Sequence, residues 1–106
     1  MKLIIEDHFL SEVANYNKVP GKSPFPDEII KAFRKRVFQI RQAYSTADLR
    51  KIGSLHFEKL KGKEYEGKYS IRFNISYRLI FRIENTENGS SKLEIICIEE
   101  ISNHYS

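Results

Sequence analysis

Three arginines and two histidines in the second half of the chain are of types suited to phosphate chemistry. Arg72, Arg78 and Arg82 recur among the alternating apolar residues of the stretch EGKYSIRFNISYRLIFRI. A guanidinium keeps its charge and matches phosphate oxygens two at a time. His56 and His104 carry imidazoles, which can act as a base or as an acid near neutral pH. Together on one surface, these groups could cleave RNA through its own 2′-hydroxyl without a metal ion.

Two neighbouring strands are predicted to position the arginines. Residues 68–74 and 77–83 alternate apolar and polar side chains, which is typical of strands that bury one face. Phe73 is predicted to lie opposite Leu79, which requires an odd-length connection or a bulge between the strands. In that register one face is apolar, and the other carries Arg72, Asn74, Arg78 and Arg82.

The two histidines are predicted to lie at the ends of other strands. His56 alternates with Leu55 and Phe57, so it points away from the core if those two point inward. His104 follows the last predicted strand and stands next to Tyr105. Nearby arginines favour a neutral His56 as the base, and the acidic segment before His104 favours a protonated imidazole as the acid.

The order of the elements predicts an α+β fold. Pro26, followed by Asp27 and Glu28, is typical of the start of a helix. Residues 95–98 are apolar on both faces, as in a central strand. The predicted elements are a strand over 2–5, a short helix from about residue 7, a helix over 26–44, a short helix from 45 or 46 that ends at Gly53, strands over 55–60, 68–74, 77–83 and 92–100, and a turn over 84–91. We therefore expect one domain, residues 1–106, with an N-terminal strand and helices packed on a mainly antiparallel sheet.

The composition is that of a folded protein with a basic surface. The 106 residues are 41% hydrophobic and 30% charged, with a net charge of +4, so polyanions are plausible partners. Cys97 lies in an apolar strand and is expected to be a buried, inert thiol; as the single cysteine it excludes an internal disulfide. Three scattered histidines do not form a metal-ligand cluster. The first residues resemble neither a signal peptide nor a membrane span, so we expect a cytoplasmic protein without a membrane partner.

Two interpretations of the arginine-rich strands remain open at this point. Arginines opposite a core can simply be solvated and paired with Glu58, Glu94 or Glu100. Alternatively they form a phosphate-binding surface. A second basic run, KAFRKR at residues 31–36, is interpreted as the solvated side of an amphipathic helix.

The residues HFEKLKGKEYEGKYSIRFNISYRLIF, followed at the end of the chain by HYS, resemble the HigB toxins of the RelE/ParE superfamily. The family pattern is H-F-x-x-L-x-G, then G-x-[YW]-S-I-R-[IF]-N, then x-[WY]-R-[IL]-x-F, and a histidine near the C-terminus. The match runs from about Leu55 to the end. It implies a RelE-like, microbial-ribonuclease-like fold and the toxin of a type II toxin–antitoxin system. Such toxins are ribosome-dependent mRNA endonucleases that need no metal and no cofactor.

Position by position, the resemblance implies the residues of the site. The catalytic set is His56, Arg72, Arg78 and His104. The residues expected to contact RNA are Lys59, Lys61, Asn74, Arg82 and Tyr105. Relatives often carry an acidic residue and an aromatic before the last histidine, where this chain has Ser102 and Asn103.

The resemblance also implies partners. These are a helix-turn-helix antitoxin, with which the chain could form a heterotetramer, and the ribosome with its mRNA. The alternatives are a gyrase-poisoning toxin of the ParE branch and a catalytically inactive RNA-binding module. A histidine pair on an arginine-rich sheet favours the endonuclease, because a gyrase-binding protein has no need of it.

Overall fold

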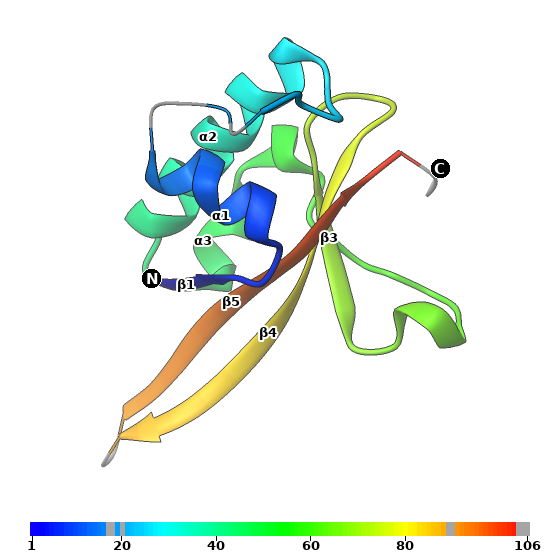
Figure 1. Cartoon of the computed structure of the whole chain (residues 1–106). Coiled ribbons are helices and arrows are strands. Elements are labelled where there is room, and N and C mark those ends of the chain that lie inside the picture. The colour runs from blue at the N-terminus through cyan, green and yellow to red at the C-terminus, as the bar shows by residue number, and fades with distance from the viewer. Residues whose placement is uncertain (17–18, 20, 89–90, 104–106) are drawn as a thin grey trace.

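Three helices pack on one face of a five-stranded sheet in the described part of the chain (Figure 1). The structure is a computed structural model that describes residues 1–16, 19, 21–88 and 91–103. The strand order is β1-β5-β4-β3-β2, with β1 parallel to β5 and the other pairs antiparallel. This arrangement confirms the predicted α+β class.

The elements follow the predicted order, with differences at their ends. The strands are β1 (Lys2–Ile5), β2 (Glu58–Lys59), β3 (Lys68–Arg72), β4 (Arg78–Asn88) and β5 (Ser91–Ser102). The helices are α1 (His8–Asn15), α2 (Asp27–Gln42) and α3 (Thr46–Lys51), and two short 3₁₀ helices are η1 (Gly53–Leu55) and η2 (Lys63–Tyr65). None of the described helices is long and apolar enough to span a membrane.

Local chemistry explains where the first two helices begin. The carboxylate of Asp7 accepts a hydrogen bond of 2.8 Å from the main-chain nitrogen of Leu10 and so caps α1. Pro26 precedes α2, whose first turn carries Asp27 and Glu28. Their negative charges complement the unpaired N–H groups at that end of the helix.

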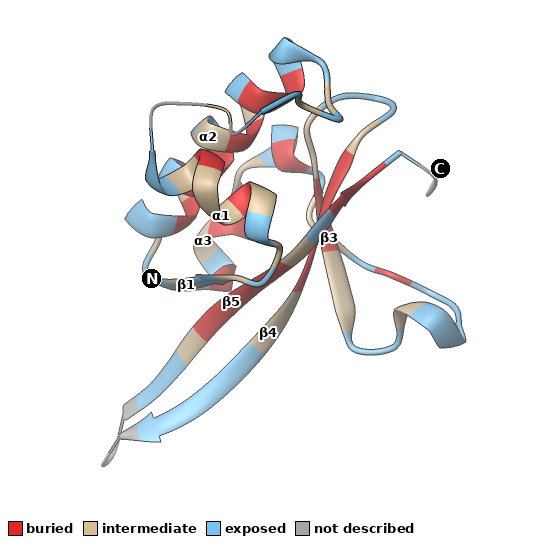
Figure 2. Cartoon of the chain, viewed as in Figure 1, coloured by how far each residue is buried: buried red, intermediate tan, exposed pale blue. Residues whose placement is uncertain are grey.

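The hydrophobic core lies between the helices and one face of the sheet. Phe33 and Ile40 of α2 are fully buried, as are Leu79 and Phe81 of β4. Figure 2 shows these buried segments where the helices meet the sheet. Cys97 is also buried, 2% exposed, and burial raises the pKa of its thiol, as expected for an inert side chain.

The hairpin of β3 and β4 is shifted by two residues from the predicted register. Ile71 lies opposite Leu79, and Phe73 donates a main-chain hydrogen bond of 3.0 Å to Tyr77. The prediction that Phe73 faces Leu79 is therefore wrong. Because side chains alternate with a period of two, a shift of two residues leaves each side chain on its predicted face.

Two predicted segments are wrong. Residues 84–88 and 91 belong to strands and not to a turn, so β4 and β5 form a long ribbon that projects from the rest of the sheet (Figure 1). Continuous main-chain pairing with β5 holds this polar segment extended, although the side chains of residues 84–87 face water. The predicted strand over 55–60 is reduced to Glu58–Lys59, because η1 and a left-handed turn at His56 precede it.

Candidate functional site

One face of the sheet, opposite the helices, carries most of the chemically active side chains, and we name it the arginine face. Arg72 at the end of β3 and Arg78 at the start of β4 are direct partners in the strand pairing. Alternation places seven residues on this face: Glu58, Lys68, Ser70, Arg72, Arg78, Ile80 and Arg82. The structure thus brings all three arginines singled out in the sequence to one side of the sheet.

Arg78 is held in place by neighbours on β2 and β3. It is only 7% exposed. Its Nη1 donates to Glu58 Oε1 in an ion pair and to Ser70 Oγ at 3.2 Å. The side chain of Glu58 is 43% exposed. Arg78 therefore has a fixed guanidinium, and Glu58 presents a carboxylate partly open to solvent beside it.

Arg72 has a buried group without a partner. Its Nε is buried and forms no hydrogen bond with any part of the chain that the structure describes. A buried donor left unpaired costs about 1–3 kcal/mol. The side chain of Arg72 as a whole is only partly buried, so the accessible part of its guanidinium is suited to contact a phosphate.

Arg36 connects α2 to the end of β3, from the side of the sheet that the helices cover. Its Nε donates 3.1 Å to the main-chain oxygen of Arg72, and its Nη1 donates 2.9 Å to Gln39 Oε1. It is 9% exposed, and burial lowers its pKa. The interpretation of residues 31–36 as wholly solvated is therefore wrong for this arginine, because the end of β3 packs against it.

Arg82 lies within a network of carboxylates. It donates to Glu6 at 2.5 Å, to Glu99 at 2.8 Å and to Glu84 at 2.9 Å. The pairing of β4 with β5 shifts between Ile80 and Phe81, which leaves Glu99 as the extra residue of a bulge. The hydrogen bonds that Arg82 donates to these carboxylates, that to Glu99 foremost, raise the pKa of Arg82.

Lys68 completes this network. It pairs with Glu99 at 2.8 Å, and this hydrogen bond is the main reason that the pKa of Lys68 is raised. The network joins two cations to three carboxylates, which lie on β3, β4, β5 and the residue that follows β1. Arg82 was expected to contact RNA, and its guanidinium is engaged in ion pairs within the protein.

The loop that carries His56 is anchored by an aromatic ring. His56 is exposed and has a φ of 46°, a left-handed conformation that is uncommon outside glycine. The next residue, Phe57, packs its ring 5.6 Å from that of Phe81 and 5.8 Å from that of Tyr69. Arg50 lies over the same ring at 4.3 Å. These contacts hold His56 at the surface, two residues before Glu58.

The remaining predicted site residues are placed as follows. Lys59 and Lys61 are exposed. Asn74 is exposed in the β3–β4 loop, where its Oδ1 accepts hydrogen bonds of 2.8 Å from the main-chain nitrogens of Ser76 and Tyr77. The amide oxygen of Asn74 thus shapes the loop. His104 and Tyr105 lie outside the described residues.

Two residues of this site were not singled out in the sequence. Glu58 was considered only as an ion-pair partner of the arginines. No pattern in the sequence indicated the role of Arg36, because its hydrogen bond is to Arg72, which lies 36 positions later in the chain. Among the described residues, no group of three or more histidine, cysteine, aspartate or glutamate side chains could hold a metal ion.

Comparisons with known proteins agree with this architecture. The family model for RelE-like toxins of the HigB type II toxin–antitoxin system matches residues 5–96. The structure is similar to that of a YoeB/ParE toxin from Agrobacterium tumefaciens, with a TM-score of 0.56 and 16% sequence identity, over 99% of this chain and 100% of the other. At this identity the likeness shows the fold. No curated protein matches the sequence.

Proposed function

The chain belongs to the family of HigB-like, RelE-like toxins of type II toxin–antitoxin systems, and on that premise we propose that it inhibits translation as a ribosome-dependent mRNA endonuclease. The observation that carries this proposal is the buried, unpaired Nε of Arg72 directly across from Arg78. Two adjacent guanidiniums on a face free of helices can bind the scissile phosphate. They also oppose the charge that develops on it during cleavage.

The reaction requires a base, an acid and a phosphate clamp. The 2′-hydroxyl loses its proton to a base and attacks the phosphorus, and the bond to the 5′-oxygen breaks as an acid protonates that oxygen. We assign His56 as the base, His104 as the acid, and Arg72 and Arg78 as the clamp. Each step uses groups of the protein, so the proposed chemistry needs no cofactor.

Glu58 is a second candidate for the base. Its carboxylate contacts Arg78 and is partly exposed on the same face. A carboxylate in reach of the 2′-hydroxyl can accept its proton as a general base. Comparison of Glu58→Gln with His56→Ala separates the two assignments, because only the variant that lacks the base should lose most of the cleavage rate.

Substrate and partners follow from the same proposal. Lys59, Lys61 and Tyr105 would contact the RNA around the scissile phosphate, and the ribosome would present the message. Toxins of type II systems pair with an antitoxin. We propose that the antitoxin of this toxin is a helix-turn-helix protein and that the two form a heterotetramer in the cytoplasm.

The test is a comparison of the wild-type protein with Arg72→Ala and with the control Lys51→Ala, an exposed cation of α3. Purified ribosomes carrying a defined message are incubated with each protein, and the cleavage products are resolved. We expect Arg72→Ala to cleave about a hundredfold more slowly, as for loss of a transition-state contact worth about 3 kcal/mol. Induction in cells should stop translation first. Arrest of DNA replication before translation would contradict the proposal and favour a gyrase poison, and intact messages on the ribosome would favour an inactive RNA-binding module.

A further inference from the structure

Arg50, in the last turn of α3, is an exposed arginine that an aromatic ring holds in place. The Cζ atom of its guanidinium lies 4.3 Å from the centroid of the Phe57 ring. The negative face of an aromatic ring attracts a cation, so this contact orients the guanidinium. The side chain of Arg50 has no hydrogen-bond or ion-pair partner among the described residues. Its free side is therefore accessible to a ligand.

Phe57 is a firm support for this arginine. Its ring centroid lies 5.6 Å from that of Phe81, a fully buried residue of the core. Phe57 also stands between His56 and Glu58 in the chain, and these are the two residues proposed as the base. The ring that orients Arg50 is thus part of the segment that carries the proposed site.

The strand β2 forms one edge of the described sheet, and it is only two residues long. Its side chains point to opposite faces, Glu58 to the arginine face and Lys59 to the side of the helices. Lys59 is exposed. A strand of RNA that crossed this short edge would pass from Arg72 on one face to Lys59 and Arg50 on the other.

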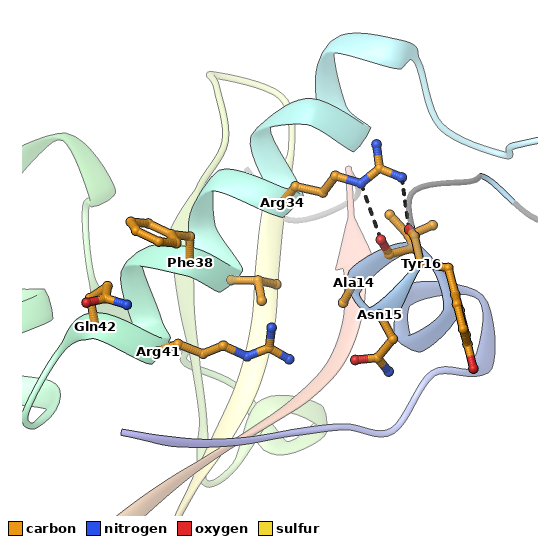
Figure 3. Close-up of a pocket in the computed structure, with 9 residues that line it drawn as sticks. Ala14, Asn15, Tyr16, Arg34, Phe38, Arg41 and Gln42 are labelled. Atoms are coloured by element: carbon orange, nitrogen blue, oxygen red, sulfur yellow. Dashed lines mark hydrogen bonds between the residues drawn. The ribbon is translucent and has the colours of Figure 1, made fainter.

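The other arginines of the helices are less suited to contact such a strand. Arg34 donates to two main-chain oxygens at the end of α1, at 3.3 and 3.4 Å, as Figure 3 shows. Arg41 lines a pocket of about 480 Å³ between α1 and α2, to which no described residue of the sheet contributes (Figure 3). Arg36 is buried and bound to the main chain of β3. Arg50 combines an accessible guanidinium with a place beside the proposed site.

From this placement we propose that Arg50 stacks on the base of a nucleotide next to the scissile phosphate. The inference rests on the proposed function, because it requires RNA at the site. A guanidinium plane can stack on the face of an unpaired base in single-stranded RNA. The base would lie on the side of Arg50 that faces away from Phe57, so that ring, guanidinium and base form three layers. A purine has the larger face, so Arg50 would favour a purine at this position.

The test uses the full chain and ribosomes that carry a message with one vacant codon. Each position of that codon is replaced in turn by 2-aminopurine, whose fluorescence falls when it stacks. 2′-O-methyl groups on the codon prevent attack by the 2′-oxygen, so binding is measured without cleavage. We expect the wild-type protein to lower the fluorescence at one position. Arg50→Ala and Arg50→Lys should each require about tenfold more protein for half of this change.

Arg50→Lys is the decisive variant. A lysine keeps the charge and can remain over the Phe57 ring, but it has no planar face on which a base can stack. Lys51→Ala removes a neighbouring exposed cation and should change the response less than about twofold. An unchanged response in Arg50→Lys would overturn the proposal, because charge alone would then explain the contact. A wild-type protein that leaves the fluorescence unchanged at every position would overturn it as well.

Cleavage of the unmodified message is measured in parallel, so that the two proposals fail separately. If the message stays intact but the fluorescence depends on Arg50, the endonuclease proposal fails and the stacking contact stands. If the message is cleaved but Arg50→Lys responds like the wild-type protein, the stacking contact fails and the endonuclease proposal stands.

Discussion

Arg36 on α2 donates a hydrogen bond of 3.1 Å to the main-chain oxygen of Arg72 on β3. The donor is a buried cation that has no carboxylate partner among the described residues. Its acceptor belongs to the last residue of the strand before the hairpin loop. A residue of the helix layer thereby contacts the main chain of Arg72, the arginine on which the proposed site depends.

Loss of Arg36 should reduce cleavage more than stability. Arg36→Met removes the hydrogen bond that fixes the end of β3, but it also removes a buried charge, and the two effects on the free energy of unfolding oppose each other. We expect the melting temperature to change little and single-turnover cleavage to fall about tenfold or more, with ribosome affinity nearly unchanged. Arg36→Lys should restore part of the rate, because its ammonium can donate to the same oxygen. The control is Gln39→Ala, which removes only the second partner of Arg36. Equal losses of stability and activity in Arg36→Met would indicate a purely structural role.

Replacement of Arg78 should affect both chemistry and stability. The side chain is buried and paired with Glu58, so Arg78→Ala deprives a partly exposed carboxylate of its partner and opens space beside Ser70. We expect a loss of about 1–2 kcal/mol in urea unfolding and a loss of about a hundredfold in cleavage. The cleavage assay must therefore be run on protein shown to be folded by circular dichroism. Full cleavage by folded Arg78→Ala would remove this residue from the phosphate clamp.

The cleavage rate should show a bell-shaped dependence on pH, with one limb due to each histidine. A base must be neutral and an acid must be protonated, so the rate falls at both extremes of pH. In single-turnover reactions on ribosomes, His56→Ala should lose the low-pH limb and His104→Ala the high-pH limb. If His104→Ala cleaves normally at every pH, the acid is another group, and Tyr105→Phe is the next variant to measure. If Glu58→Gln and not His56→Ala removes the low-pH limb, the base is Glu58.

Glu99 should make stability depend on pH in the acid range. Burial alone would raise the pKa of this carboxyl, but hydrogen bonds from Lys68 and Arg82 outweigh burial, and its pKa lies below the usual 4.5. A carboxyl with a lowered pKa stabilises the folded state above its unfolded-state pKa and loses that contribution as the pH falls through the folded-state value. Wild-type protein should therefore be more stable to urea than Glu99→Gln at pH 7, and the difference should shrink below about pH 4.5. A difference that is constant from pH 7 to pH 3 would contradict this assignment.

The sequence by itself determined which side chains share a face. Alternation along a strand has a period of two, so Arg72, Arg78 and Arg82 were predicted on one side even though the register of their hairpin was predicted two residues away from its position. The helices were likewise predicted from local signals, such as Pro26 at the start of α2. These properties depend on neighbours within a few residues, and local spacing is what a sequence displays directly.

The sequence indicated Glu58 as a possible partner of these arginines, and Arg78 pairs with it. Only the tertiary structure decided the other contacts of the charged groups. Arg82 pairs with Glu6, which lies 76 positions away and is brought close by the pairing of β1 with β5 and of β5 with β4. A bulge in β5 directs Glu99 into the same network. The packing of α2 buries Arg36 beneath the end of β3, and the Nε of Arg72 is left without a partner. Ion pairs act over a few ångströms, and strand order and helix packing set the distances between the elements that carry the charges. For this reason no local pattern in the sequence could distinguish Arg82, which is neutralised by carboxylates, from Arg72, which remains available to a phosphate.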